Sequence, residues 1–126
     1  MQFMIIRRAD ADTEAGALPT PELMAAMGRY MEEMGKAGIL RGGNGLHPSA
    51  RGARVKFHGG RPTVVDGPFT EAKEIIAGYS ILAVDSKEEA VEWTKRFVAV
   101  DAEIRTIPEV ECELRRIFEP EDFPAA

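Results

Sequence analysis

The chain has 126 residues, a length that suits one domain spanning residues 1–126 and allows it to bury a sizeable core. Apolar residues make up 44% and charged residues 29%, which excludes global disorder. Asp and Glu number 21 against 16 Lys and Arg, and the net charge of −5, without a dense basic stripe, argues against a nucleic-acid partner. The single cysteine, Cys112, excludes an internal disulfide, and its apolar alternation predicts a packed core thiol.

The apolar segments are short. The longest uncharged apolar stretch, residues 75–84, is too short to span a bilayer. Residues 1–6 are apolar but precede Arg7 too closely to form a secretory signal. We therefore expect a cytoplasmic protein with no membrane partner.

The N-terminal segment predicts a strand with two apolar faces. Over residues 1–8, the two-residue period of a strand places Phe3 and Ile5 on one face and Met4 and Ile6 on the other. Such a strand is typical of a sheet that is covered on both sides.

The clearest helix follows a small, acidic segment. Residues 9–19 are expected to form a loop, because they lack apolar periodicity and contain glycine and proline. Over residues 20–38, Thr20 suits the N-cap and Pro21 the first helical position. The spacing of four apolar side chains predicts one buried stripe. Its members are Leu23, Met27, Tyr30 and Met34.

The middle of the chain predicts an inserted β-hairpin. Residues 39–45 begin as a short strand and become glycine-rich. Residues 53–58 alternate apolar and polar side chains, as a half-exposed strand does. Gly59-Gly60 is a two-residue turn signal, after which residues 63–66 return as the paired strand.

The remaining elements are less regular. Ser86, with Glu89 three residues later, predicts the start of a second helix. The expected elements are a helical turn over 70–76, a strand over 78–84, a helix from Ser86 to about Val98, a loop over 99–110, a strand over 111–118 and a tail over 119–126.

The order of the elements predicts a ferredoxin-like α+β fold, with two helices on one face of an antiparallel sheet and an inserted hairpin. Strands 1–8 and 78–84 carry apolar side chains on both faces, and a wet second face would be a large apolar patch. We expect a homodimer in which two copies pack sheet to sheet. The alternative is that the hairpin folds back over its own sheet.

The segment that follows the hairpin is unusually charged. Asp66 ends the returning strand and precedes Gly67-Pro68, and Glu71 and Lys73 follow closely. A carboxylate at a strand end beside an apolar cleft suits an acid or a base. The structural alternative is that Asp66 accepts hydrogen bonds from turn N–H groups, while Glu71 and Lys73 belong to a solvated helical face.

This segment resembles a known signature. Residues 66–74, Asp-Gly-Pro-Phe-Thr-Glu-Ala-Lys-Glu, are similar to the motif of DGPF-domain proteins, a branch of the YCII-related family. The likeness covers most of the chain, through blocks at residues 27–30, 37–40, 45–49, 77–79, 86–90 and 93–97. It implies a ferredoxin-like fold that dimerises into an α+β barrel. It implies no reaction, because members are mostly of unknown function and some are encoded with or fused to extracytoplasmic-function sigma factors.

The resemblance also implies part of a site. Wider YCII relatives have a proposed His–Asp pair with the His on the first helix. Asp66 resembles that Asp, but the helix over residues 20–38 contains no His, so the pair does not transfer whole. His47 is the better substitute, because its loop position suits proton transfer in a cleft, whereas His58 shares a strand face with Arg54.

Other side chains complete the candidate ligand site. Arg54 suits a bidentate contact with a carboxylate or phosphate. Tyr79 suits either a hydroxyl near Asp66 or a place in the core. The candidate ligand-binding residues are Arg54, Phe69, Glu71, Lys73 and Tyr79.

Two functions from different classes follow. The first is binding of a small polar or anionic metabolite in a cleft between the sheet and the first helix, with acid–base catalysis by Asp66, assisted by His47. No cofactor or metal is expected, because the glycine-rich residues 42–45 lack a phosphate-binding fingerprint and two histidines eleven residues apart make no convincing metal site. The alternative is a non-catalytic regulatory or interaction module that acts beside a sigma factor.

Overall fold

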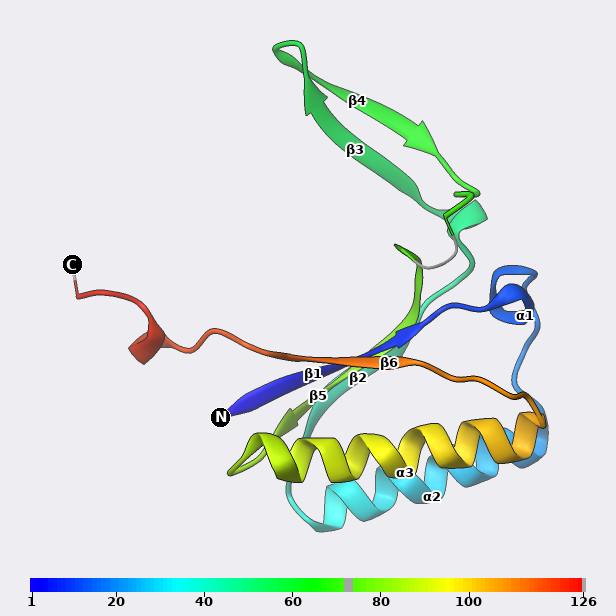
Figure 1. The fold of residues 1–126 in the computed structure, drawn as a ribbon, viewed down its shortest axis with the longest axis vertical. Coiled ribbons are helices and arrows are strands. Elements are labelled where there is room, and N and C mark those ends of the chain that lie inside the picture. Colours follow the sequence, from blue (N-terminus) through cyan, green and yellow to red (C-terminus); the bar gives the residue numbers. More distant parts are fainter. Residues whose placement is uncertain (72–73, 126) are drawn as a thin grey trace.

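The computed structural model describes residues 1–71 and 74–125, and Figure 1 shows a helical layer, a sheet and a projecting arm. The sheet is antiparallel, with strand order β2-β5-β1-β6. Its strands are β1 (Gln2–Arg8), β2 (Leu40–Gly45), β5 (Ile76–Ala83) and β6 (Cys112–Arg116). The helices α2 (Pro21–Lys36) and α3 (Lys87–Arg105) lie on one face of this sheet. The predicted ferredoxin-like α+β fold is confirmed.

Helix α2 begins and packs as its sequence predicts. The Thr20 hydroxyl accepts a hydrogen bond from the Leu23 N–H at 3.1 Å, and Pro21 occupies the first turn. Tyr30 and Met34 are buried in the core, where Met34 has no exposed surface. The predicted stripe therefore faces the sheet.

Helix α3 is longer than predicted. Ser86 caps it as expected, accepting a hydrogen bond from the Glu89 N–H at 3.1 Å. The prediction that residues 99–110 form a loop is wrong for residues 99–105, because the helix continues to Arg105, and is confirmed for residues 106–110. In the last turns of the helix, charged side chains, including the buried Asp101, point toward the interior. The apolar periodicity that signals a helix is therefore missing there.

The segment predicted as a loop over residues 9–19 contains one helical turn, α1 (Ala11–Glu14). Asp10 caps this turn by accepting a hydrogen bond from the Thr13 N–H at 2.9 Å. The Thr13 hydroxyl in return accepts one from the Asp10 N–H at 2.9 Å. This reciprocal capping explains how so short a helix forms.

The two faces of the sheet have different surroundings. Phe3 and Ile5 of β1 are buried against the helices, together with Leu82 of β5. The intervening side chains point to the other side and are only partly buried. This second surface, which we call the open face, carries Met4, Ile6, Tyr79 and Ile81 at its centre, and the charged Glu113 and Arg115 of β6 lie on the same side at its edge.

The inserted hairpin is a separate arm. It consists of β3 (Ala53–His58) and β4 (Arg61–Asp66), so the second strand begins two residues earlier than predicted. Gly59 and Gly60 have φ values of 63° and 81°, the left-handed conformation that a tight two-residue hairpin turn requires. Every residue of both strands is exposed, and Figure 1 shows the arm rising from the side opposite the helices. The alternative that the hairpin covers its own sheet is therefore wrong.

Short segments join these elements. A single turn, η1 (Ser49–Arg51), precedes the hairpin, and Gly67 after it lies against the Ser49 carbonyl, where any side chain would collide with backbone. The helical turn expected over 70–76 partly lies outside the described residues, and Ile76 already belongs to β5. A last turn, η3 (Pro120–Asp122), lies in the C-terminal segment. Within the described ranges, no helix has the length and apolar character needed to cross a membrane.

Candidate functional site

A cavity of about 620 Å³ lies between α2, α3 and the sheet surface that faces them. This is where the sequence led us to expect a cleft. Side chains of α2 and β1 form much of an apolar wall, including Leu23, Met27 and Ile5. Charged side chains line another part of it, namely Arg7, Asp12, Asp101 and Arg105.

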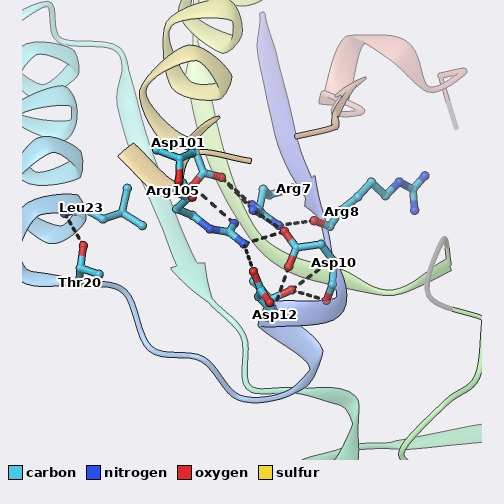
Figure 2. Close-up of polar contacts among 10 residues, drawn as sticks. Arg7, Arg8, Asp10, Asp12, Thr20, Leu23, Asp101 and Arg105 are labelled. Carbon is cyan, nitrogen blue, oxygen red and sulfur yellow. Dashed lines mark hydrogen bonds and ion pairs between the residues drawn. The ribbon is translucent and has the colours of Figure 1, made fainter. Parts of the chain in front are cut away.

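Three of the charged residues at the cavity form one hydrogen-bonded group with Asp10, which lies beside them (Figure 2), and we call this group the Arg–Asp cluster. Its members are Arg7, Asp10, Asp101 and Arg105. Arg7 donates from Nε and Nη2 to Asp101 Oδ2 at 3.1 and 2.8 Å, and from Nη2 to Asp10 Oδ2 at 3.2 Å. Arg105 Nη2 donates to the same Asp10 oxygen at 2.8 Å. Asp10 thus joins both arginines.

Three separate elements bring this cluster together. Arg7 is near the end of β1, Asp10 caps α1, and Asp101 and Arg105 are one turn apart on α3. Arg7 is 8% exposed and Asp101 is 3% exposed, so their pairing lies in the interior. Burying an unpaired charge there would cost solvation free energy. The hydrogen bonds between Arg7 and Asp101 offset this cost for both groups.

Contacts within the cluster favour the charged forms of Asp10 and Arg105. Burial by itself would raise the pKa of Asp10, but hydrogen bonds from the Thr13 N–H, Arg105 and Arg7 outweigh it and hold that pKa at about 2. Burial lowers the pKa of Arg105, yet its hydrogen bond with Asp10 and the charge of Asp101 raise it overall. Two guanidinium groups thus face two carboxylates, with Asp12 a further 3.7 Å from Arg105. No positive charge is left in excess.

One of the predicted site residues, Tyr79, contributes to the cavity lining. Because side chains alternate along β5, the Tyr79 side chain lies on the open face, opposite Ile6. There its hydroxyl accepts a hydrogen bond from Asn44 Nδ2 at 3.2 Å. The backbone of Tyr79 is therefore the part beside the cavity.

The other predicted site residues lie elsewhere. Arg54 and Phe69 meet at the base of the hairpin, where the guanidinium lies 4.0 Å from the ring centroid, and Arg54 Nη2 is 3.7 Å from Glu74. Asp66 is exposed at the end of β4, opposite Ala53. His47 and Glu71 are also exposed, and none of these residues lines the cavity. Lys73 lies outside the described residues.

The Arg–Asp cluster was not predicted from the sequence. One signal was present: Arg7 continues the alternation of Phe3 and Ile5, which places a charge on the buried face of a strand. Asp101 and Arg105 had the spacing of an ion pair on a helix, but the segment was expected to be a loop.

The fold and the cavity define a ferredoxin-like α+β protein with a ligand-sized space between its helices and its sheet. The family model of the YCII-related domain matches residues 1–111, and the chain belongs to this family. Strand β6 and the C-terminal segment follow the matched region. No curated protein matches the chain. Membership of the DGPF branch stays a prediction from the sequence.

Proposed function

We propose that this YCII-related protein binds a small organic molecule in the cavity between α2, α3 and the sheet. The observation that carries the proposal is an apolar cavity that ends at an internally compensated Arg–Asp cluster. Its volume of about 620 Å³ is within the range of small-molecule sites.

The two parts of the cavity favour different parts of one ligand. The apolar wall around Leu23 and Met27 favours a hydrocarbon or aromatic body. At the charged part, an anionic head would compete with carboxylates that the arginines already bind. A neutral head that donates and accepts hydrogen bonds needs no further counter-charge. Of the polar and anionic ligands expected from the sequence, we therefore propose the polar class.

Two matched variants of α2 test this proposal. Met27 lines the cavity, whereas Met24 on the same helix is exposed. A library of neutral, amphipathic small molecules is screened by thermal denaturation. We expect hits that raise the melting temperature of the wild type and of Met24→Trp, but not of Met27→Trp, whose indole fills the cavity. A compound present at a free concentration of a hundred times its Kd adds about 2.7 kcal/mol to the free energy of unfolding.

Circular dichroism of both unliganded variants provides the control for folding. The proposal fails if no compound stabilises the wild type, or if the hits stabilise Met27→Trp equally. Catalysis by Asp66 is a separate prediction from the sequence. Because Asp66 is exposed and does not line the cavity, the proposal gives the cavity a binding function that does not depend on that carboxylate.

We also propose that the protein is a homodimer joined through the open face. Both long helices lie on the other side of the sheet, and the hairpin leaves the open face uncovered. Met4, Ile6 and Ile81 form a continuous apolar surface there, since neighbouring strands place them side by side. A second copy packed sheet to sheet would remove this surface from water.

A further inference from the structure

The hairpin has one apolar and one basic side. Residues directly opposite each other on paired strands share a side, so Val55 lies with Val64 and Phe57 with Pro62. These side chains are exposed, and Phe57 has 73% of its surface in contact with solvent. The opposite side carries Arg54, Lys56, His58 and Arg61. An exposed apolar strip on a projecting arm is typical of a surface that docks on a partner.

The C-terminal segment over residues 117–125, here called the tail, has complementary properties. Phe118 and Phe123 are 73% and 58% exposed, and their ring centroids lie 5.1 Å apart. The tail is held to β1, because Glu119 Oε1 accepts a hydrogen bond from the Gln2 N–H at 2.9 Å. It thus presents two aromatic rings from a fixed position, outside the segment that the family model matches.

The charges of the two segments are opposite in sign. Hairpin residues 53–66 contain three basic side chains (Arg54, Lys56 and Arg61) and one acid, Asp66 at its base, a formal charge of +2 with His58 neutral. Tail residues 117–125 contain three acidic side chains (Glu119, Glu121 and Asp122) and no base, a formal charge of −3. Such complementarity steers two surfaces together and fixes their register.

Within one protomer the two segments emerge from opposite ends of the sheet (Figure 1). The hairpin follows β2, which ends at Gly45 opposite Gly78, whereas the tail follows Arg116, which pairs with Phe3 near the start of β1. We place the two-fold axis of the proposed dimer between the two sheets and perpendicular to the strands, so that it reverses the strands of the second copy. It therefore brings the hairpin end of each sheet over the tail end of the other.

The arm is long enough for this contact. A six-residue strand extends ~20 Å, about twice the ~10 Å that separates packed sheets. The arm rises on the open-face side, where the proposed second copy packs. We infer that each hairpin docks its apolar side on the aromatic rings of the partner's tail, while its long basic side chains reach round the edge of the hairpin to the tail's carboxylates, so that two equivalent contacts clasp the dimer. This inference rests on the homodimer proposed above.

Charge reversal on each side of the contact tests the clasp. We expect Arg61→Glu and Glu121→Arg each to raise the Kd of the homodimer by about tenfold, measured by sedimentation at several protein concentrations. An equimolar mixture of the two variants restores tight association, because both contacts of the mixed dimer then pair opposite charges. The same double reversal within one chain restores the homodimer.

Two matched control variants separate the effect of the clasp from general effects of net charge and of surface hydrophobicity. Lys95→Glu, on the exposed side of α3, changes the net charge as Arg61→Glu does and leaves the Kd unchanged. Phe57→Ser raises the Kd, whereas Met24→Ser, at an exposed methionine of α2, does not. Circular dichroism confirms that all variants fold.

The outcomes separate the clasp from the dimer itself. A wild-type dimer whose Kd is the same in Arg61→Glu and Glu121→Arg overturns the clasp and leaves the sheet-to-sheet dimer standing. Weakened single variants that fail to associate when mixed also overturn it. A wild type that sediments as a monomer at micromolar concentration overturns the homodimer and the clasp together.

Discussion

Asp10 has two functions in the structure, as the cap of α1 and as the carboxylate that joins Arg7 to Arg105. Its capping hydrogen bond requires only a side-chain oxygen, which asparagine also provides. Its ion pairs require the negative charge. The substitution Asp10→Asn therefore removes the charge and keeps the cap.

We expect Asp10→Asn to lower the free energy of unfolding at pH 7 by about 1 to 2 kcal/mol, after allowance for solvent screening. Because folding lowers the pKa from 3.8 to about 2, the stabilisation is complete above pH 4 and is lost as the pH falls through 2. Urea unfolding of both proteins between pH 2 and pH 7 measures this. If the two proteins differ in free energy of unfolding by the same amount at every pH in this range, the ion pairs of Asp10 are not the source of the stabilisation.

Two other polar side chains contribute to packing. The Tyr30 hydroxyl donates to the Trp93 carbonyl at 2.9 Å, and its ring meets those of Trp93 and Phe97 edge to face. Burial raises the pKa of Tyr30 to about 12 and that of the Cys112 thiol also to about 12. Cys112 packs against the core, as predicted. Both groups are therefore protonated at neutral pH.

At the scale of elements, the length of α3 decides whether Arg7 meets a buried counter-charge at the cavity. Had the helix ended near Val98, Asp101 and Arg105 would not face Arg7. The helix ends at Thr106, which has φ 51° and ψ 42°. This left-handed conformation is unfavourable for a β-branched residue and favourable for glycine.

We expect Thr106→Gly to raise the free energy of unfolding by about 1 kcal/mol, because glycine adopts the left-handed conformation without a Cβ clash. Thermal or urea unfolding measures the effect. Thr106→Ala is the matched control, since alanine removes the hydroxyl and keeps the Cβ. Equal stability of the glycine and alanine variants would show that the left-handed conformation is not the source of the gain.

At the scale of the whole molecule, the sheet has one face covered by its own helices and one that is open. If a second copy covers the open face, folding and association are linked, and the melting temperature rises with protein concentration. A second copy docked as we infer would also contact both hairpin arms. Association would then contribute to the stability of the folded protein.

We expect the wild type to sediment as a dimer at micromolar concentration and Ile81→Lys to sediment as a monomer, because the lysine places a charge in the middle of the open face. Met24→Lys, on the exposed side of α2, is the control and stays dimeric. A monomeric wild type with a cooperative melting transition that is independent of concentration would contradict the homodimer.

Much of the fold could be predicted from the sequence, because its signals are local. Thr20 and Ser86 cap helices a few residues away, and Gly59 with Gly60 determines a turn between adjacent strands. The two-residue alternation of β1 indicated an apolar face on each side of the sheet. These features depend on neighbours in the chain, so they can be identified without knowledge of the tertiary structure.

The charged part of the cavity was decided by tertiary structure alone. Asp101 is separated from Arg7 by 94 positions in the chain. It lies in the last turns of α3, in a segment that has no apolar periodicity. A charged side chain becomes stable in the interior only when its partner is brought to it by the fold. The sequence by itself determined the order of the elements and the two-sided sheet, whereas the packing of α1, α3 and β1 determined which charges meet, because that pairing depends on distances between residues remote in the chain.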